Sequence, residues 1–187
     1  MTYGKARYAA IDFESAGSAP GKTDAPIQLG IALMEGGTIQ TEGALRTYLR
    51  TDRPVTWTAQ QVHGITDGDL ADAPSLAELW PEIQRRLTGR VIVAHSAATE
   101  KRFLRLFPTH RFGPWVDTLA LGREIHPGLA SHRLGDLVQA LDLESSLALA
   151  CPGLRWHDAL YDATASLILL ARLIRDGAME NLPLESH

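Results

Sequence analysis

Two carboxylates stand two residues apart in the segment AIDFES, at Asp12 and Glu14. Residues Arg7–Glu14 read as a buried strand, and side chains two apart on a strand point to the same face. At a rise of about 3.3 Å per residue, their Cα atoms lie roughly 7 Å apart. Two negative charges this close at the end of a buried strand repel each other, and a divalent cation removes that cost. The plainer alternative is a pair of solvated acids.

A third acidic residue, Glu100, lies on the apolar side of a predicted helix. It precedes Phe103, Leu104 and Phe107 at the spacing of one helix face. An ionised glutamate on that face turns toward protein rather than water. The alternative is a first-turn acid that complements the helix dipole.

The segment HDALYDA, residues 157–163, supplies a histidine and a fourth carboxylate. A helix that begins near Asp158 places Asp162 one turn inside it and leaves His157 just outside, at the less constrained cap. A fixed carboxylate ligand beside a mobile base is a workable division of labour for proton transfer. The alternative is that His157 and Asp158 only cap the helix.

Four carboxylates and one histidine together could bind divalent metal ions and transfer a proton. They are Asp12, Glu14, Glu100, Asp162 and His157. Hard oxygen ligands without cysteine favour Mg²⁺ or Mn²⁺ over a structural zinc ion. Two such ions about 3.5–4 Å apart can clamp the attacking and leaving oxygens of an in-line phosphodiester displacement. A neutral histidine can take the proton from the attacking water.

Five strands are expected to position these groups. They are Arg7–Glu14, Ile27–Met34, Thr38–Leu49, Arg90–Ala94 and Trp115–Asp117. The first three form an antiparallel meander, because a loop of small residues, Ser15–Asp24, and a tight turn, Glu35–Gly37, connect them. Gly43 marks a bulge or bend in the third strand.

Helical spacing alternates with the later strands. The first helix has its apolar face at Leu76, Leu79, Trp80, Ile83 and Leu87. Pro74 suits its first turn, whereas Pro81 should kink or split it. Further helices are expected from Glu100, from Thr118, around Leu134–Leu141 and along Ala163–Ile174. The order of elements predicts an α/β fold with a mixed sheet flanked by helices.

Length and composition exclude several classes of protein. With 187 residues, we expect a single domain spanning residues 1–187. The longest apolar run, Leu167–Ala171, is far too short to cross a membrane, and no signal peptide is evident. A cytoplasmic location is therefore expected. One cysteine, Cys151, excludes an internal disulfide, and we expect it to be a buried or half-buried thiol.

The net charge of the chain limits how it could bind nucleic acid. The chain has 18 basic and 22 acidic residues, a formal charge of −4 with histidine neutral. This argues against a broad basic surface that coats nucleic acid through many phosphate contacts. Two divalent cations on the four carboxylates make the protein formally neutral. We therefore expect weak nucleic-acid binding without metal, and low processivity without a partner.

Three segments, in order along the chain, resemble the motifs of the DEDDh class of 3′–5′ exonucleases. This DnaQ-like proofreading group includes the epsilon subunit of bacterial DNA polymerase III. AIDFES matches the first motif, AHSAATEKRFL (Ala94–Leu104) is similar to the second, and HDALYDA looks like the third. QVHGIT (Gln61–Thr66) and the stretch Val116–Leu141 also resemble family segments, so the resemblance covers essentially the whole chain.

The resemblance implies an RNase H-like fold with a five-stranded mixed sheet and two Mg²⁺ or Mn²⁺ ions. Asp12 would be shared by both ions, and Glu14 and Asp162 would complete the first site. His157 would be the general base. Glu100 stands where the family usually has Asp, so its longer side chain would reach the second ion differently or through water.

The resemblance also implies contacts with the 3′ end of a nucleic acid. Phe13 and Ser15 would offer backbone or hydroxyl contacts there. His63, Gly64 and Ile65 would lie against the terminal nucleotide, with Ile65 a candidate for contact with base or sugar.

Two further features lie beside these motifs. Ser96 replaces the usual Asn of the second motif and is a candidate N-cap for the following helix. The loop Ala16–Asp24 borders the site, where Lys22 either contacts a phosphate or stays solvated.

The expected activity is metal-dependent 3′–5′ exonucleolysis of single-stranded or frayed DNA, with release of nucleoside 5′-monophosphates. Two alternatives remain open. One is an RNA-trimming, oligoribonuclease-like enzyme, since contacts to a 2′-OH are not readable from sequence. The other is a polymerase-associated, nucleic-acid-binding subunit whose catalysis is weakened by Glu100. A proofreading role requires a polymerase or other nucleic-acid-processing partner in trans.

The remaining histidines and the tryptophans are interpreted structurally. His95 is expected to make structural hydrogen bonds. His110, His126 and His132 are expected at the surface. The tryptophans expected in the core are Trp57, Trp80, Trp115 and Trp156, of which Trp156 alone, beside His157, is a candidate for substrate contact.

Overall fold

A five-stranded mixed sheet forms the centre of the computed structural model, which describes residues 1–18 and 24–184. Lys22 lies outside the described residues. The strands are β1 (Arg7–Ser15), β2 (Pro26–Glu35), β3 (Thr38–Tyr48), β4 (Val91–Ala94) and β5 (Trp115–Asp117). Their order is β3-β2-β1-β4-β5, with antiparallel pairing from β1 to β3 and parallel pairing of β1, β4 and β5. The predicted meander and mixed sheet are both confirmed.

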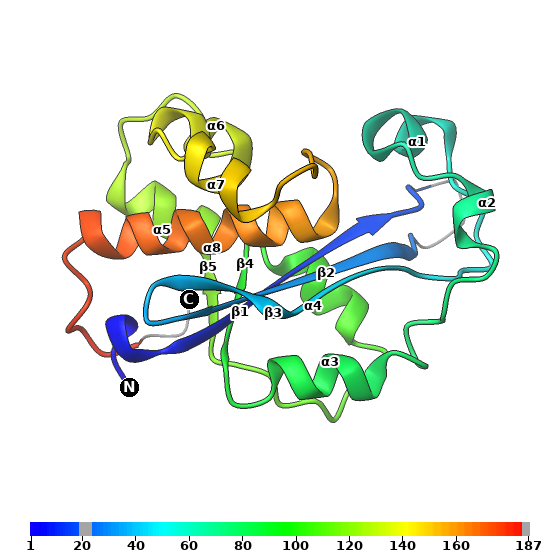
Figure 1. Ribbon diagram of the computed structural model, residues 1–187, viewed down its shortest axis with the longest axis horizontal. Coiled ribbons are helices and arrows are strands. Elements are labelled where there is room, and N and C mark those ends of the chain that lie inside the picture. The colour runs from blue at the N-terminus through cyan, green and yellow to red at the C-terminus, as the bar shows by residue number, and fades with distance from the viewer. Residues whose placement is uncertain (19–23, 185–187) are drawn as a thin grey trace.

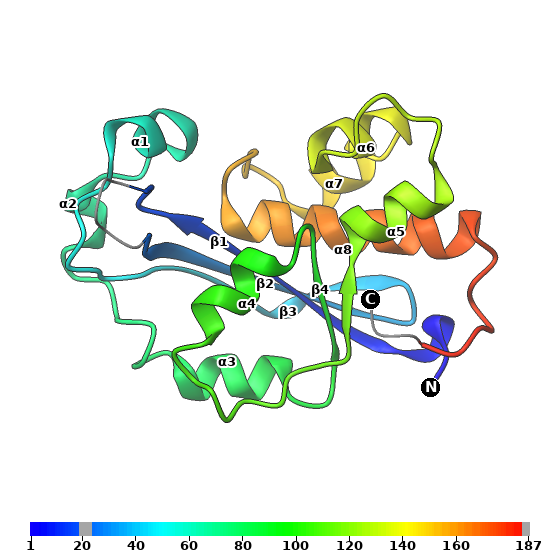
Figure 2. The same cartoon turned by 180° about the vertical axis from the view of Figure 1, so that it is seen from behind.

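Helices cover both faces of this sheet (Figures 1 and 2). The long helix α8 lies across one face with α5, α6 and α7, and α3 and α4 lie on the other. The bounds are η1 (Tyr3–Lys5), α1 (Trp57–His63), α2 (Asp67–Leu70), α3 (Trp80–Leu87), α4 (Ala98–Leu104), α5 (Thr118–Ile125), α6 (Leu134–Ala140), α7 (Glu144–Ala150) and α8 (Ala159–Asp176). Within the described ranges, no helix combines the length and apolar character needed to cross a membrane.

Side chains of β1 alternate between two apolar cores. Tyr8 and Ala10 face the core beneath α8, whereas Phe13 faces the core beneath α3 and α4. Asp12 and Glu14 continue the series of Tyr8 and Ala10, so the two-residue period of the strand turns both carboxylates toward α8.

Two local expectations are wrong, namely where the helix after Pro74 begins and whether Trp57 is buried. The helix expected from Leu76 begins at Trp80, and Pro81 lies in its first turn, where a missing N–H costs no hydrogen bond. Pro81 therefore splits the predicted helix rather than kinking it. Trp57, expected in the core, is 72% exposed on α1.

The bulge expected at Gly43 is confirmed by its φ of +85° and by a register shift between β2 and β3.

The first turn of α8 lies in direct contact with β2 at Gly30. A Cβ on Gly30 would come within 2.1–2.3 Å of backbone atoms of Ala159 and Leu160, so no larger residue fits without displacement. Gly30 pairs with Asp12 in the β1–β2 ladder. This contact therefore places the beginning of α8, including Asp162, beside the carboxylates of β1.

Gly30→Ala is expected to destabilise the protein by about 1–3 kcal/mol or more, because the new methyl group meets backbone rather than a side chain that can rotate away. Chemical denaturation measures the change in the free energy of unfolding. Gly128→Ala is the matched control, since nothing lies within 4 Å of a Cβ there. Equal stability of both variants would contradict the close-contact account.

Candidate active site

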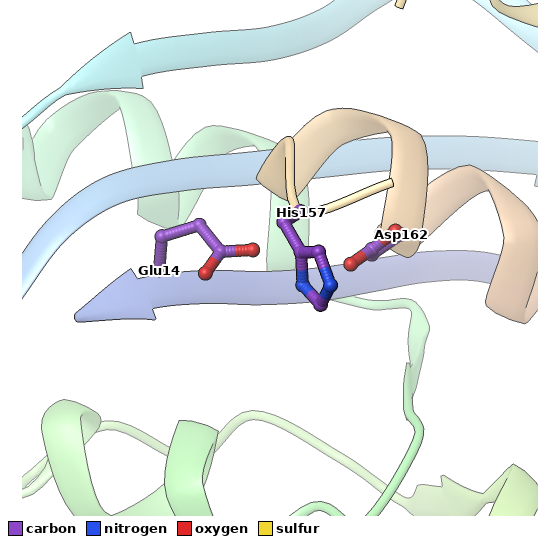
Figure 3. Close-up of side chains that lie close together, drawn as sticks. All are labelled: Glu14, His157 and Asp162. Atoms are coloured by element: carbon purple, nitrogen blue, oxygen red, sulfur yellow. The ribbon is translucent and has the colours of Figure 1, made fainter. Parts of the chain in front are cut away.

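The five ionisable side chains expected from the motifs come from four segments of the fold. They are Asp12 and Glu14 on β1, Glu100 on α4, Asp162 on α8 and His157 in the loop before α8. Figure 3 shows the His157 ring between the carboxylates of Glu14 and Asp162. One nitrogen or oxygen atom from each of these three residues lies within 4.8 Å of the others.

Asp12 lies within the electric field of the other acidic groups. Burial raises the pKa of its carboxyl well above the ordinary value. The negative charges of Asp162, Glu100 and Glu14 raise this pKa further, in that order. Strand β1 and helices α4 and α8 thus place the other three carboxylates where each repels that of Asp12.

The other three carboxyl groups are also perturbed. Burial is the main cause, and it raises the pKa of Glu14, Glu100 and Asp162 to about 7 in each case. For Asp162, the charge of Glu14 is the second cause. Near neutral pH, ionising this cluster therefore costs free energy that a bound cation would return.

Two buried oxygens at the site have no hydrogen-bond partner among residues 1–18 and 24–184. They are Oε2 of Glu100 and Oδ1 of Asp162. Buried polar atoms in proteins nearly always have a partner, so two unpartnered carboxylate oxygens within one acidic cluster suit the binding of a cation. An all-oxygen donor set with excess negative charge suits Mg²⁺ or Mn²⁺. The residues present therefore fit the divalent ions that the motifs imply.

His157 occupies an unusual backbone position. It is exposed and has a φ of +64°, in the left-handed region that non-glycine residues rarely adopt. The next residue, Asp158, is the N-cap of α8, and its Oδ1 accepts a hydrogen bond from the Leu160 N–H at 3.1 Å. His157 thus stands just outside the helix, as predicted, next to a cap that fixes its backbone.

A hydrogen-bonded network ties that cap to the sheet. Asp158 Oδ2 accepts from Arg46 Nε at 2.6 Å and from Gln28 Nε2 at 3.1 Å. Gln28 Oε1 in turn accepts from the Ala159 N–H at 2.9 Å. Gln28 and Asp158 are buried, so the two hydrogen bonds of Gln28 are made where water does not compete, whereas that of the exposed Arg46 is only partly buried. The network holds the loop of His157 against β2 and β3.

His63 joins the end of β1 to the turn after α1. Its Nδ1 accepts a hydrogen bond from the Ile65 N–H at 3.0 Å, so the other ring nitrogen, Nε2, carries the proton and donates to the Ser15 carbonyl at 3.2 Å. Burial lowers the pKa of His63, which favours this neutral form. Both nitrogens are engaged within the protein, so His63 positions its neighbours.

A cavity of about 260 Å³ lies beside His157. His63, Gly64 and Ile65 line it together with Arg46, Tyr48, Arg155 and Asp158. The Phe13 side chain points away from α8, toward the core beneath α3 and α4. There its ring meets that of Phe103 edge-on at a centroid distance of 5.4 Å. Only the backbone of Phe13 is therefore available on the side of the carboxylates.

Sequence reasoning overlooked Gln28, Gly30 and Arg46. A signal was present, since Gln28 and Gly30 interrupt an otherwise apolar strand, IQLGIALM. A buried glutamine requires partners, and a glycine inside a strand marks a close approach of another backbone. Arg46 carries no comparable signal, because an exposed arginine on an edge strand is ordinary.

The N-cap expected at Ser96 is wrong. Helix α4 begins after Ala97 without a side-chain cap. Ser96 has a φ of +68°, and its backbone N–H donates to Asp117 Oδ1 at 3.0 Å. The Asp117 carboxylate also accepts from the N–H of Ala97, so it fixes the backbone just before the helix.

The other histidines are hydrogen-bonded parts of the scaffold. His95 contacts Thr118 Oγ1 and the His132 carbonyl, both at 2.9 Å, which confirms its structural role. His126 and His132 are half-buried rather than fully exposed, and His126 lies 2.8 Å from Asp176. His110 is half-buried against Phe112. The buried thiol expected at Cys151 is confirmed.

Comparison with known proteins shows the family to which the chain belongs. The sequence model of the RNase_T family, described as Exonuclease, matches residues 9–170. The chain therefore belongs to this exonuclease family. It is 32% identical to the PolC-type DNA polymerase III of Thermotoga maritima over 178 residues, which are 92% of this chain and 12% of that protein. It is 27% identical to a DNA polymerase III subunit epsilon-like protein of Rhodobacter capsulatus, over 91% of this chain and 24% of that protein.

Solved structures support the same assignment. Exonuclease X, in complex with 5′-overhanging duplex DNA, superposes with a TM-score of 0.76 at 26% identity, covering 91% of this chain and 93% of that one. The nuclease domain of 3′hExo, a DEDDh family member bound to rAMP, has a TM-score of 0.74 at 16% identity, covering both chains in full. The expected RNase H-like fold with its five-stranded mixed sheet is confirmed. The chain spans about an eighth of the PolC-type relatives.

We expect the contribution of the site carboxyls to the stability of the metal-free protein to fall as pH rises from about 4.5 to 7, while the lowered pKa values of His63, His95 and His110 act in the opposite direction. Carboxyls whose pKa is raised to about 7 bind more protons in the folded state than in the unfolded chain over this range, so folding is favoured at low pH. Saturating Mg²⁺ or Mn²⁺ should raise Tm most above pH 7. Thermal melts with EDTA or metal test this.

Glu14→Gln should reduce both the pH dependence and the gain in Tm from metal. Glu144→Gln, at an exposed glutamate on α7, is the control and should change neither. A metal-induced gain in Tm that is equal at pH 5 and pH 8 would contradict this assignment of the carboxylates.

Proposed function

We propose that the protein is a metal-dependent 3′–5′ exonuclease that removes nucleoside 5′-monophosphates from single-stranded or frayed DNA. The observation that carries the proposal is the convergence of four carboxylates and His157 beside a cavity of about 260 Å³. Membership of the exonuclease family supports phosphodiester hydrolysis. The polymerase relatives, and the DNA bound by Exonuclease X, favour DNA as the substrate. A cytoplasmic location and a polymerase partner in trans remain predictions.

The proposed chemistry assigns one task to each group. Asp12, Glu14, Glu100 and Asp162 would hold two divalent ions, which when bound would supply positive charge to the scissile phosphate. His157 accepts a proton from the attacking water, whose oxygen bonds to phosphorus. The bond from phosphorus to the 3′ oxygen of the preceding nucleotide breaks, and that oxygen takes a proton from solvent. The exposure of His157 leaves its ring free to pass the accepted proton to water.

We assign the 260 Å³ cavity to the 3′-terminal nucleotide. Gly64 and Ile65 form one wall, and His63 fixes that wall to the end of β1 through its two hydrogen bonds. Ser15 lies at this junction, and the backbone of Phe13 borders the carboxylates. A cavity of this size favours removal of one residue at a time over cleavage inside a strand.

RNA is the second candidate substrate. A structural neighbour binds rAMP, although at 16% identity it shows only a shared fold. Matched DNA and RNA oligonucleotides of one sequence separate the two, and equal or faster hydrolysis of RNA would favour the RNA-trimming alternative. A weakened, binding-only subunit would instead gain activity with Glu100→Asp. The buried Glu100 carboxylate already interacts with Asp12, so we expect no such gain.

Asp12→Ala is expected to lower hydrolysis of a 5′-labelled oligonucleotide by on the order of 10²–10³-fold, because the central ligand is lost. EDTA should abolish activity of the wild type, and Mg²⁺ or Mn²⁺ should restore it. Asp72→Ala, at an exposed aspartate, is the control. Activity that persists in EDTA would exclude the metal mechanism.

His157→Gln should lower kcat by on the order of 10²–10⁴-fold with little change in binding of a 3′ end, since the side chain moves a proton rather than gripping substrate. Equal losses in binding and rate would argue against a general base.

A further inference from the structure

A second cavity, of about 460 Å³, opens beside His157. Its lining includes Asp162, Trp156 and Arg133, and it shares only His157 with the terminal-nucleotide cavity. A third cavity, of about 520 Å³, continues from it through shared Arg133 and Leu134. We call these two connected cavities the α5–α6 groove, because they lie along the residues of α5 and the start of α6.

The charge of the α5–α6 groove suits an anion. Arg123 and Arg133 line it, and both are exposed. Neither arginine forms an ion pair with any residue in the described ranges. Beyond the catalytic cluster, the carboxylate of the lining is Asp136, whose Oδ2 accepts a hydrogen bond from Ser131. The two uncommitted guanidinium groups therefore outweigh one carboxylate in a groove that begins at the active site.

An aromatic side chain is fixed at the inner end of this groove. Trp156 is half-buried and packs edge-on against Tyr161 at a centroid distance of 5.0 Å. A Cβ on Gly135 would lie 3.7 Å from its indole ring, so the missing side chain leaves space beside the ring. A ring held in this way is a suitable surface for stacking of a nucleobase.

We propose that the α5–α6 groove binds the single strand on the 5′ side of the scissile phosphate. Arg133 and Arg123 contact successive upstream phosphates, and Trp156 stacks against a base next to the cut. This inference rests on the proposed exonuclease function and adds the path of the strand. It also explains how a chain with a net charge of −4 guides nucleic acid without a broad basic surface.

A larger cavity elsewhere is the rival path. It measures about 620 Å³ and contains Arg50, Arg102 and Arg105, but its lining includes none of the catalytic residues. Two of these arginines are already paired, Arg50 with Glu78 at 3.2 Å and Arg102 with Asp24 at 3.4 Å. Continuity with the active site and unpaired charge both favour the α5–α6 groove.

The test compares a DNA dinucleotide with a 12-residue strand. A dinucleotide has no upstream phosphodiester for Arg123 and Arg133 to contact, although its 5′ base still reaches Trp156. Arg123→Ala and Arg133→Ala should therefore raise KM for the 12-mer while leaving dinucleotide hydrolysis unchanged. Each variant should also reduce the slope of log(kcat/KM) against log salt by about 0.7, the value for one phosphate contact with a single strand. Arg175→Ala, at an exposed arginine in the last turn of α8, should change neither.

Two results would overturn the proposed path. One is an equal loss on both substrates in the Arg123 and Arg133 variants. The other is a reduced salt slope in Arg105→Ala while those variants keep the wild-type slope. Fluorescence anisotropy of the 12-mer with Ca²⁺ separates this inference from the function on which it rests. Suppose that the wild-type protein hydrolyses neither substrate, but that the variants show a smaller dependence of 12-mer binding on salt. That result would support the groove as the binding site of the strand and contradict the exonuclease proposal.

Discussion

The contact between Gly30 and the first turn of α8 is the constraint on which the site depends. A β-strand can present two carboxylates on one face by its own period, but it cannot supply a third from another direction. The absence of a side chain at Gly30 lets the α8 backbone approach the sheet directly beside Asp12. Gln28 and Asp158 then fix that approach by hydrogen bonds at the N-terminus of the helix.

This arrangement concentrates repulsion at one end of an otherwise apolar fold. Two hydrophobic cores, one on each face of the sheet, stabilise the elements that carry the charges. The carboxylates add an unfavourable term near neutral pH, which burial makes larger than it would be in water. Proteins commonly hold such unfavourable groups at functional sites, where a ligand relieves them. The same carboxylates that oppose folding therefore make the site selective for a cation.

Much of this site could be predicted from sequence, because local rules position most of its parts. The strand period places Asp12 and Glu14 on one face, and capping preferences place His157 just before α8 with Asp158 as the cap. The docking of α8 on β2 is a tertiary contact, and Gly30 indicated only that some backbone would approach there. Only the three-dimensional structure shows that the backbone approaching Gly30 is that of Ala159, in the first turn of α8.

Helices α1, α2 and α7 were not predicted from the sequence, and the physical reason is the same for all three. Helices α1 and α7 each bury a single residue, His63 and Leu147 respectively, so they have no apolar period to detect. Helix α2 is one turn held by a capping box between Thr66 and Asp69. Short polar helices of this kind are defined by caps and by their neighbours in space. Gly64 and Ile65, which form one wall of the 260 Å³ cavity, lie between two of these short helices, α1 and α2.

The most direct test of the central claim is the affinity of Mn²⁺ for the wild-type protein and for Gly30→Ala, measured by isothermal titration calorimetry. If the approach of α8 to β2 assembles the ligand set, Gly30→Ala should weaken Mn²⁺ binding by about tenfold or more, as expected when groups that support metal ligands are displaced. Gly128→Ala should bind like the wild type. Unchanged affinity in a folded Gly30→Ala protein would contradict the claim that this contact assembles the site.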